Sequence, residues 1–461
     1  QYYRPYCLGH QRNNIMPILK RIYNYIGINE PILDSRASAR CGGVTITGGE
    51  EEALPANIGT PVTISPGLDR MQPLVARVSD TKAVIFYRNI LSDIKLSYVI
   101  VTSSGDSGLT LTQTTEAHLL NTFGATIEGY AVVGLSDNKI LVFYRTAAAD
   151  DTYAVVGNVS GSTITFTLPK SIGTTHDCDF SQSMYSVGKI SAGKVVFGSI
   201  KISDTKAQLQ VIEIDGSDNI TFGLIYQTTH TGCLSPKVAI CSSSLGMLST
   251  VHDTTTNLTE STVKVISFGI SGTTISFNTV AQYLNATQYP TIPAQSNRRY
   301  LLQGIAPISA TASLVTGYVG LWYPPYPGTP AINGFGTFKV TDSAGTLSPS
   351  GLLVDPDSRP TGGWTYYDDP WSAVIRHNNK VIALYNTVSP YPSKLIFISY
   401  DYSGATPAIS EFFTLNSYGA NDFLFAPSIA SLEAASNVMI CAYTQRAGGS
   451  YAIEMFAAVV A

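Results

Sequence analysis

The three tryptophans of the chain fall in two short aromatic segments, residues 321–328 and 363–371. Tryptophan and tyrosine rings stack on sugars or fill protein hot spots, and nearby carboxylates accept hydrogen bonds from hydroxyl groups. We therefore expect a ligand or partner to contact these segments. The alternative is that they only plug the fold or pack against a neighbouring subunit. The candidate ligand-binding residues are Trp322, Tyr323, Tyr326, Trp364, Tyr366, Tyr367, Asp368, Asp369 and Trp371.

These residues do not form a catalytic motif. A paired-carboxylate glycosidase needs two acids about 5–9.5 Å apart, whereas the side chains of adjacent residues such as Asp368 and Asp369 tend to diverge. Residues 176–179 (His-Asp-Cys-Asp) contain metal-ligating types, but their spacing fits no zinc pattern, and His230 and Cys233 lie at the corresponding place in the next repeat. We predict no catalytic residue, no metal and no cofactor.

An internal repeat predicts the fold that must position these segments. Residues 78–88 and 135–145 share a polar turn, a lysine and a run of β-branched and aromatic residues, and each is followed by two further strand-like segments. Repeats of several strands each are typical of β-propellers. We predict an all-β, seven-bladed propeller, with six blades as the alternative because the fifth copy matches poorly. The anchor positions are Lys82, Lys139, Lys194, Gly246, Ser313, Lys380 and Val438.

The last repeat ends before its fourth strand, which would leave open sheet edges. Residues 59–66 resemble the outer strands of other copies, so we expect this N-terminal segment to complete the last blade and close the ring. Residues 44–47 are the competing donor. The propeller is thus predicted to span residues 42–461.

Residues 1–41 are predicted to form a separate basic arm with one short helix over residues 15–26, where apolar residues recur at helical spacing. Residues 1–40 hold six Lys or Arg against two Asp or Glu, a net charge of +4, while the whole chain carries −4. We expect the arm to dock onto other structural subunits of an assembly. The alternatives are packing on its own propeller and a remnant of processing.

Composition restricts the possible partners. The body is acidic, which argues against nucleic acid, and no apolar run approaches the ~20 residues that cross a bilayer. Charged residues make up only 13% of the chain, well below the usual quarter or so. Such surfaces are frequent in secreted and virion proteins, so we expect a virion or extracellular location and no membrane insertion.

The repeat at 135–166 resembles sialidase-like propeller repeats of bacteriophage tail and fibre proteins and of bacterial surface proteins. The turn at 104–110 resembles the Asp-box of sialidases, a structural turn on the face away from the catalytic centre. The resemblance covers residues 59–461 loosely. A sialidase-like site would need three arginines; Arg88 and Arg145 end equivalent strands, but the third copy has no arginine there.

The resemblance implies a propeller that presents loops to a host-surface receptor while an N-terminal piece attaches to the particle. We therefore expect a non-enzymatic virion-associated or extracellular protein that binds a host-surface glycan or protein receptor. One alternative is a secreted, sialidase-like glycosidase acting on surface polysaccharide. Another is a purely structural spacer or decoration protein.

Overall fold

In the computed structural model, all the residues that the structure describes belong to one compact unit, Val44–Ala461. The residues that the structure describes are 58–64, 70–89, 95–104, 108–119, 127–146, 151–177, 185–201, 203–253, 261–283, 298–321, 334–354, 372–387, 394–404, 406–416, 423–432, 437–447 and 450–460. The predicted arm, its helix and the segment 44–47 lie outside them.

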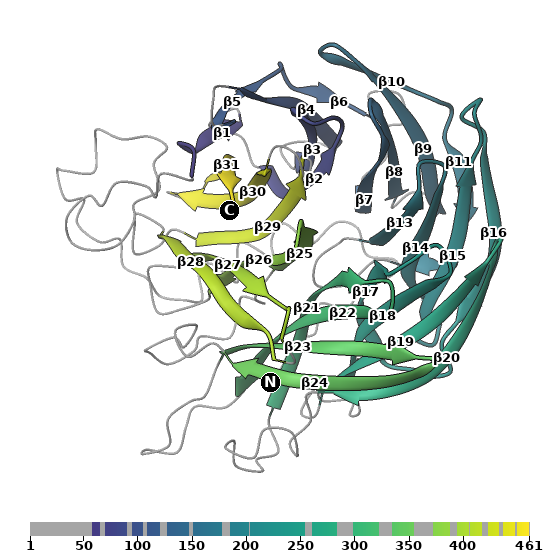
Figure 1. Ribbon diagram of the computed structural model, residues 1–461. Coiled ribbons are helices and arrows are strands. Elements are labelled where there is room, and N and C mark those ends of the chain that lie inside the picture. Colours follow the sequence, from purple (N-terminus) through teal and green to yellow (C-terminus); the bar gives the residue numbers. More distant parts are fainter. Residues whose placement is uncertain are drawn as a thin grey trace, which may run out of the picture. The chain divides into compact units, whose positions relative to one another are not determined.

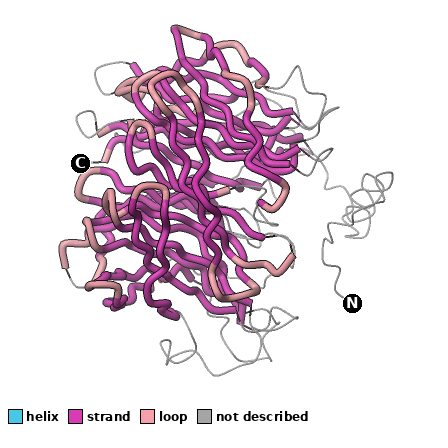
Figure 2. Tube along the Cα trace, turned by 90° about the vertical axis from the view of Figure 1, so that its right-hand side faces the viewer, coloured by secondary structure: helices cyan, strands magenta, loops and turns pink. Residues whose placement is uncertain are grey.

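The described residues form seven antiparallel sheets, and each sheet is one blade of a propeller. The predicted seven-bladed propeller is therefore confirmed, and the six-bladed alternative is wrong. The poorly matched fifth copy forms a complete sheet of its own. Figure 1 shows the blades in a ring, with β7, β13 and β17 towards the centre and β16, β20 and β24 on the rim. Figure 2 shows strands and loops but no helix in this part of the chain.

Each blade runs from an inner to an outer strand, and some blades carry a short extra strand. Blade 1 contains β2 (Arg70–Arg77), β3 (Lys82–Asn89), β4 (Lys95–Ser104), β5 (Thr110–Gln113) and β6 (Ala117–His118). Blade 2 contains β7 (Ile127–Ser136), β8 (Lys139–Thr146), β9 (Asp151–Ser160), β10 (Thr163–Phe166) and β11 (Lys170–Gly173). Blade 3 contains β12 (His176–Asp177), β13 (Ser186–Ser191), β14 (Lys194–Lys201), β15 (Ala207–Ile214) and β16 (Ile220–Gln227).

The remaining four blades have four strands each. Blade 4 contains β17 (Cys233–Ile240), β18 (Leu245–Asp253), β19 (Ser261–Ser271) and β20 (Thr274–Tyr283). Blade 5 contains β21 (Arg298–Ser309), β22 (Ala312–Leu321), β23 (Gly334–Ser343) and β24 (Thr346–Val354). Blade 6 contains β25 (Ser372–His377), β26 (Lys380–Thr387), β27 (Lys394–Asp401) and β28 (Ala408–Asn416). Blade 7 contains β29 (Phe423–Ser431), β30 (Val438–Ala447), β31 (Ser450–Val459) and β1 (Val62–Ile64).

The outer strand of blade 7 comes from the N-terminal side of the propeller. β1 pairs antiparallel with β31, with Val62 opposite Met455 and Ile64 opposite Ile453. An isolated bridge between Ile58 and Ala458 extends the pairing. The two ends of the described chain therefore share one sheet, and the ring is closed by hydrogen bonds between them.

The hydrophobic core lies between neighbouring blades. Side chains alternate across a strand, so Ile85 and Tyr87 of β3 pack in the cluster shared with blade 7, while Val84 and Phe86 pack in the cluster shared with blade 2. Between blades 2 and 3, Phe143 and Phe197 stack with ring centroids 4.5 Å apart. Burying such a side chain stabilises a fold by roughly 1.5–3 kcal/mol, which explains the two-sided apolar runs of the second strands.

Among the described residues, no helix is long and apolar enough to cross a membrane.

Candidate functional site

The nine candidate ligand-binding residues, from Trp322 to Trp371, all lie outside the described residues. The strands beside them can be placed: β22 ends at Leu321 and β25 begins at Ser372. Leu321 pairs with Arg298, which begins the inner strand β21. The expectation that these aromatic segments bind a ligand therefore stays a prediction.

Three arginines, Arg88, Arg145 and Arg446, lie at one end of the ring, which we call the arginine end. It is the end at which inner strands begin and second strands finish; the opposite end, where tight turns join these two strands, is the turn end. Arg88 and Arg145 lie close to the last residues of β3 and β8, as the repeat predicts. Arg446 lies near the end of β30 in blade 7. The repeat did not reveal Arg446 because Thr444 occupies the position equivalent to Arg88.

Bulges bend the inner strands at this end. Gln72, Ser235 and Ala426 have φ of 59°, 49° and 50°, and each precedes a proline. The strand register shifts at each of these positions. Residues other than glycine rarely adopt positive φ, and bulges are over-represented next to active sites, where they re-aim the chain. Blade 2 has a register shift at the equivalent place, around Glu128.

The bulge at Gln72 joins three blades through hydrogen bonds. Its backbone N–H donates to Thr444 Oγ1 of blade 7 at 2.9 Å, and its side-chain Oε1 accepts from Arg88 Nη1 at 3.1 Å. The hydroxyl of Tyr130, in blade 2, donates to the Gln72 carbonyl oxygen. Burial raises the pKa of Tyr130 well above its usual range, although Arg88 opposes the shift. Tyr130 is therefore a fixed neutral donor that helps to hold Arg88 in place.

Two carboxylates lie at the arginine end in unlike surroundings. Glu128 Oε2 is 3.6 Å from Arg145 Nε, and the Glu128 side chain is 41% exposed. Glu116 is only 13% exposed; its Oε1 lies 3.5 Å from Asn89 Nδ2 and 4.0 Å from His118 Nδ1. Glu116 follows the outer strand of blade 1, and Glu128 lies in the inner strand of blade 2. Neither stood out in the sequence, because neither belongs to the repeat.

Ser97 lies at this end beside a histidine, but it cannot act as a nucleophile. Its hydroxyl lies 2.7 Å from His118 Nδ1, but Ser97 is completely buried. The same 2.7 Å pairing joins His176 to Ser199 and recurs elsewhere in the ring. Burial lowers the pKa of His176 to about 4, so His176 is neutral near pH 7. These pairs satisfy buried polar groups and are structural.

Comparisons with known proteins identify no family for this chain. No protein-family model matches the chain, and no curated protein matches it. Among solved structures, the polysaccharide lyase Uly1 is 9% identical over 86% of this chain and 91% of that one, with a TM-score of 0.49. An α-L-arabinofuranosidase, Arb93A from Fusarium graminearum, is 10% identical over 72% and 93%, with a TM-score of 0.39.

The Hadza microbial sialidase Hz136 is 12% identical over 69% of this chain, with a TM-score of 0.37; the match spans 63% of the sialidase, less than two thirds of its length. The architecture that the described residues establish is a seven-bladed propeller. The expectation of a protein without enzymatic activity is corrected here: the solved structures named above are a sialidase, an α-L-arabinofuranosidase and a polysaccharide lyase. At such identities no residue role transfers to this chain.

Proposed function

We propose that the chain is a glycosidase-type enzyme that cleaves a surface polysaccharide at the arginine end of blades 7, 1 and 2. The observation that supports this is the presence of two carboxylates, Glu116 and Glu128, at the end of the ring where Arg88 and Arg145 end equivalent strands. Glycoside cleavage uses two carboxyl groups, one to donate a proton and one as an ionised partner. Environments that differ between two carboxyl groups suit this division of roles.

The surroundings suggest which carboxyl group has which role. Glu128 pairs with the cation of Arg145 at 3.6 Å and is partly exposed, which suits the ionised nucleophile or base. Glu116 is mostly buried, with Asn89 Nδ2 at 3.5 Å and His118 Nδ1 at 4.0 Å from its Oε1, and takes the remaining role of proton donor in this proposal. Arg88, held by Gln72, is placed to bind substrate oxygen atoms by charge-assisted hydrogen bonds.

The setting of this activity is part of the proposal. The low charge content supports action outside the cell or on a virion, with a host-surface glycan as the substrate. The basic segment 1–41 would attach the enzyme to other structural subunits of its assembly.

The test is a cleavage assay on the full chain with a panel of surface polysaccharides, measuring new reducing ends. Glu128→Gln and Glu116→Gln should each lower kcat by about 10²–10⁴-fold, the usual contribution of a positioned acid or base. Glu213→Gln is the matched control: Glu213 is also 41% exposed and ion-paired, with Lys194 at 3.0 Å, but lies at the turn end. Failure to cleave any polysaccharide, or full activity of both variants, would refute the proposal.

A further inference from the structure

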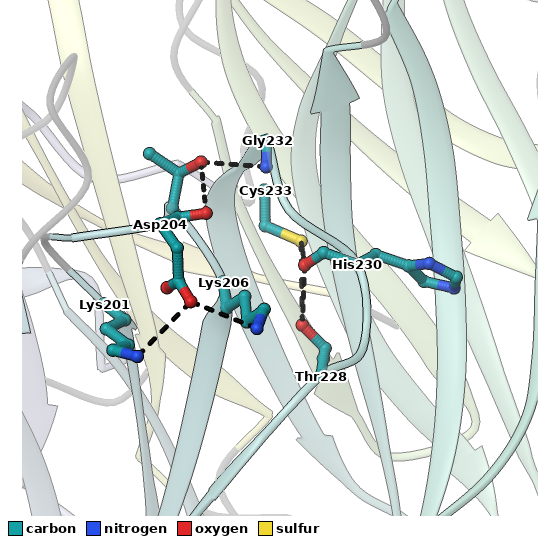
Figure 3. A network of polar contacts seen from close by, with 8 residues as sticks. Lys201, Asp204, Lys206, Thr228, His230, Gly232 and Cys233 are labelled. Atoms are coloured by element: carbon teal, nitrogen blue, oxygen red, sulfur yellow. Dashed lines mark hydrogen bonds and ion pairs between the residues drawn. The ribbon is translucent and has the colours of Figure 1, made fainter.

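The loop between β14 and β15 in blade 3 brings two lysines to one carboxylate, as Figure 3 shows. Lys201 Nζ lies 3.3 Å and Lys206 Nζ 3.1 Å from Asp204 Oδ2. All three side chains are partly exposed. An ammonium group has three N–H donors, so each lysine is held in position while donors remain for a second acceptor.

The backbone of this loop is strained and tied to blade 4. Thr205 has φ of 52°, which is a genuine outlier for a β-branched residue. Gly232 N donates to Thr205 Oγ1 and Cys233 N donates to Thr205 O, both at 2.8 Å. Strained residues persist only where the surroundings enforce them, and they cluster at functional sites. The two lysines are therefore presented by a rigid loop.

Blade 4 adds a lysine, Lys264, that interacts electrostatically with His230 and Cys233, and Cys233 is hydrogen-bonded to Thr205 of this loop. Burial lowers the pKa of Lys264. Lys264 of β19 is only 4% exposed, and no ion pair involves it among the described residues. The charge of Lys264 acts on His230: the pKa of His230 is lowered mainly by burial and to a smaller extent by Lys264. Lysines are rarely buried unless paired. Among the described side chains around this loop, the three lysines Lys201, Lys206 and Lys264 outnumber the one carboxylate, Asp204, so the net charge is positive even when Asp204 is ionised.

The position of the lysines continues a series. Arg88, Arg145 and Lys201 lie at or next to the ends of β3, β8 and β14, the second strands of three consecutive blades. The strand ends therefore place one cation per blade around the arginine end, and a polymeric ligand running across blades 1 to 3 would meet them in turn.

We propose that Lys201 and Lys206, with the buried Lys264 adding positive charge nearby, form a subsite that binds an acidic group, carboxylate or sulfate, on a sugar unit of the polysaccharide. This inference rests on the proposed function, because its ligand is the polysaccharide that the enzyme would cleave. That polysaccharide would then be anionic. The cleaved bond would lie over blades 7 to 2, and the acidic unit over blades 3 and 4.

The test is calorimetric binding to the full chain carrying Glu128→Gln, which prevents turnover. The probes are an oligogalacturonate (carboxylate only), a chondroitin sulfate oligosaccharide (carboxylate and sulfate) and a neutral malto-oligosaccharide. Lys201→Gln combined with Lys206→Gln should weaken binding of an acidic probe by about tenfold or more, the loss expected for charged hydrogen bonds. A larger effect on the sulfated probe would identify sulfate as the preferred group.

Two controls keep the result interpretable. Lys194→Gln removes an ion-paired lysine from the opposite end of the same strand, β14, and should leave binding unchanged. Lys201→Arg with Lys206→Arg keeps both charges and should retain most of the affinity. If no acidic probe binds, or if the Gln pair binds acidic probes as well as its parent does, the subsite proposal is overturned. Lysine-dependent binding without any cleavage would uphold the subsite and reject the enzyme.

Discussion

At the scale of single residues, the arginine end depends on one buried hydroxyl. Tyr130 donates to the carbonyl oxygen of Gln72, whose side chain in turn accepts from Arg88. Tyr130→Phe keeps the ring but leaves the carbonyl without this donor. Losing a buried hydrogen bond costs about 1–3 kcal/mol.

We therefore expect Tyr130→Phe to lower the free energy of unfolding by about 1–3 kcal/mol, measured by urea denaturation, and to raise KM because Arg88 loses its support. Tyr226→Phe is the control, because Tyr226 packs beside a core cluster. If Tyr226→Phe lowered stability as much as Tyr130→Phe, the hydroxyl of Tyr130 would have no special role.

At this scale the repeat predicted strand positions and not site residues. Arg88 and Arg145 were expected at equivalent strand ends because they share a position with respect to Lys82 and Lys139, but neither was a candidate site residue. Glu116 and Glu128 were missed because a bulge and an irregular connection place them, and neither leaves a periodic signal. Pro73, Pro236 and Pro427 were an available signal for the bulges, since each follows a residue with positive φ.

At the scale of elements, adjacent blades are joined by polar contacts at the turn end. Asp218, in the turn between β15 and β16, accepts from Lys139 Nζ at 2.5 Å and from Asn158 Nδ2 at 2.7 Å. Its φ of 65° is one that Asp and Asn tolerate best among residues other than glycine. The hydrogen bond from Lys139 is the main cause of the lowered pKa of Asp218.

Asp218→Asn keeps the backbone conformation but removes the charge opposite Lys139. It should lower the free energy of unfolding by about 1 kcal/mol, the net value of a typical hydrogen bond, measured at pH 7. Because the pKa of Asp218 is lowered by folding, its contribution should disappear as the pH falls through the acidic range. Asp215→Asn is the control, since the hydrogen bonds of the Asp215 side chain stay within its own turn and only its charge acts on Lys139. An equal effect of both variants would contradict the inter-blade role.

The ring-closing strand β1 pairs with β31, and β31 contains a buried acid. Glu454 of β31 is 1% exposed, and its Oε1 accepts a hydrogen bond from Thr63 Oγ1 of β1 at 2.6 Å. Burial raises the pKa of Glu454 to about 7, while the bond from Thr63 opposes the shift. The folded state therefore favours the protonated carboxyl.

Because folding raises the pKa of Glu454, protonation of this group favours the folded state. Its contribution to stability is complete below the pKa of the unfolded chain, near 4.5, and is lost as the pH rises through about 7. We expect the free energy of unfolding to fall by on the order of 3 kcal/mol from this group between those values. Glu454→Gln should flatten the profile, as measured by denaturation from pH 4 to 8, whereas Glu213→Gln should not. An unchanged slope in Glu454→Gln would show that other groups cause it.

At the scale of the whole molecule, the number of blades could be read from the sequence because the second strand of every blade is buried on both sides. Two-sided burial selects the same apolar run in each copy, as in 82–88 and 139–145. The predicted anchor positions fall at or within one residue of the starts of β3, β8, β14, β18, β22, β26 and β30. The site has no such constraint, because the loops and bulges at the arginine end differ from blade to blade.

Function could not be read from the fold, since propellers carry many activities. The aromatic segments 321–328 and 363–371 led to the hypothesis that the protein binds a receptor. In the described part of the ring, the proposed enzymatic function rests on Arg88, Arg145, Glu116 and Glu128 at the arginine end.

The most direct test of the central claim is a crystal structure of the Glu128→Gln chain with an oligosaccharide from the polysaccharide that the wild type cleaves. We predict a sugar in contact with Arg88 and Glu116, at the arginine end of blades 7 to 2. A sugar bound only at the Trp322 or Trp371 segments, with the arginine end empty, would contradict it.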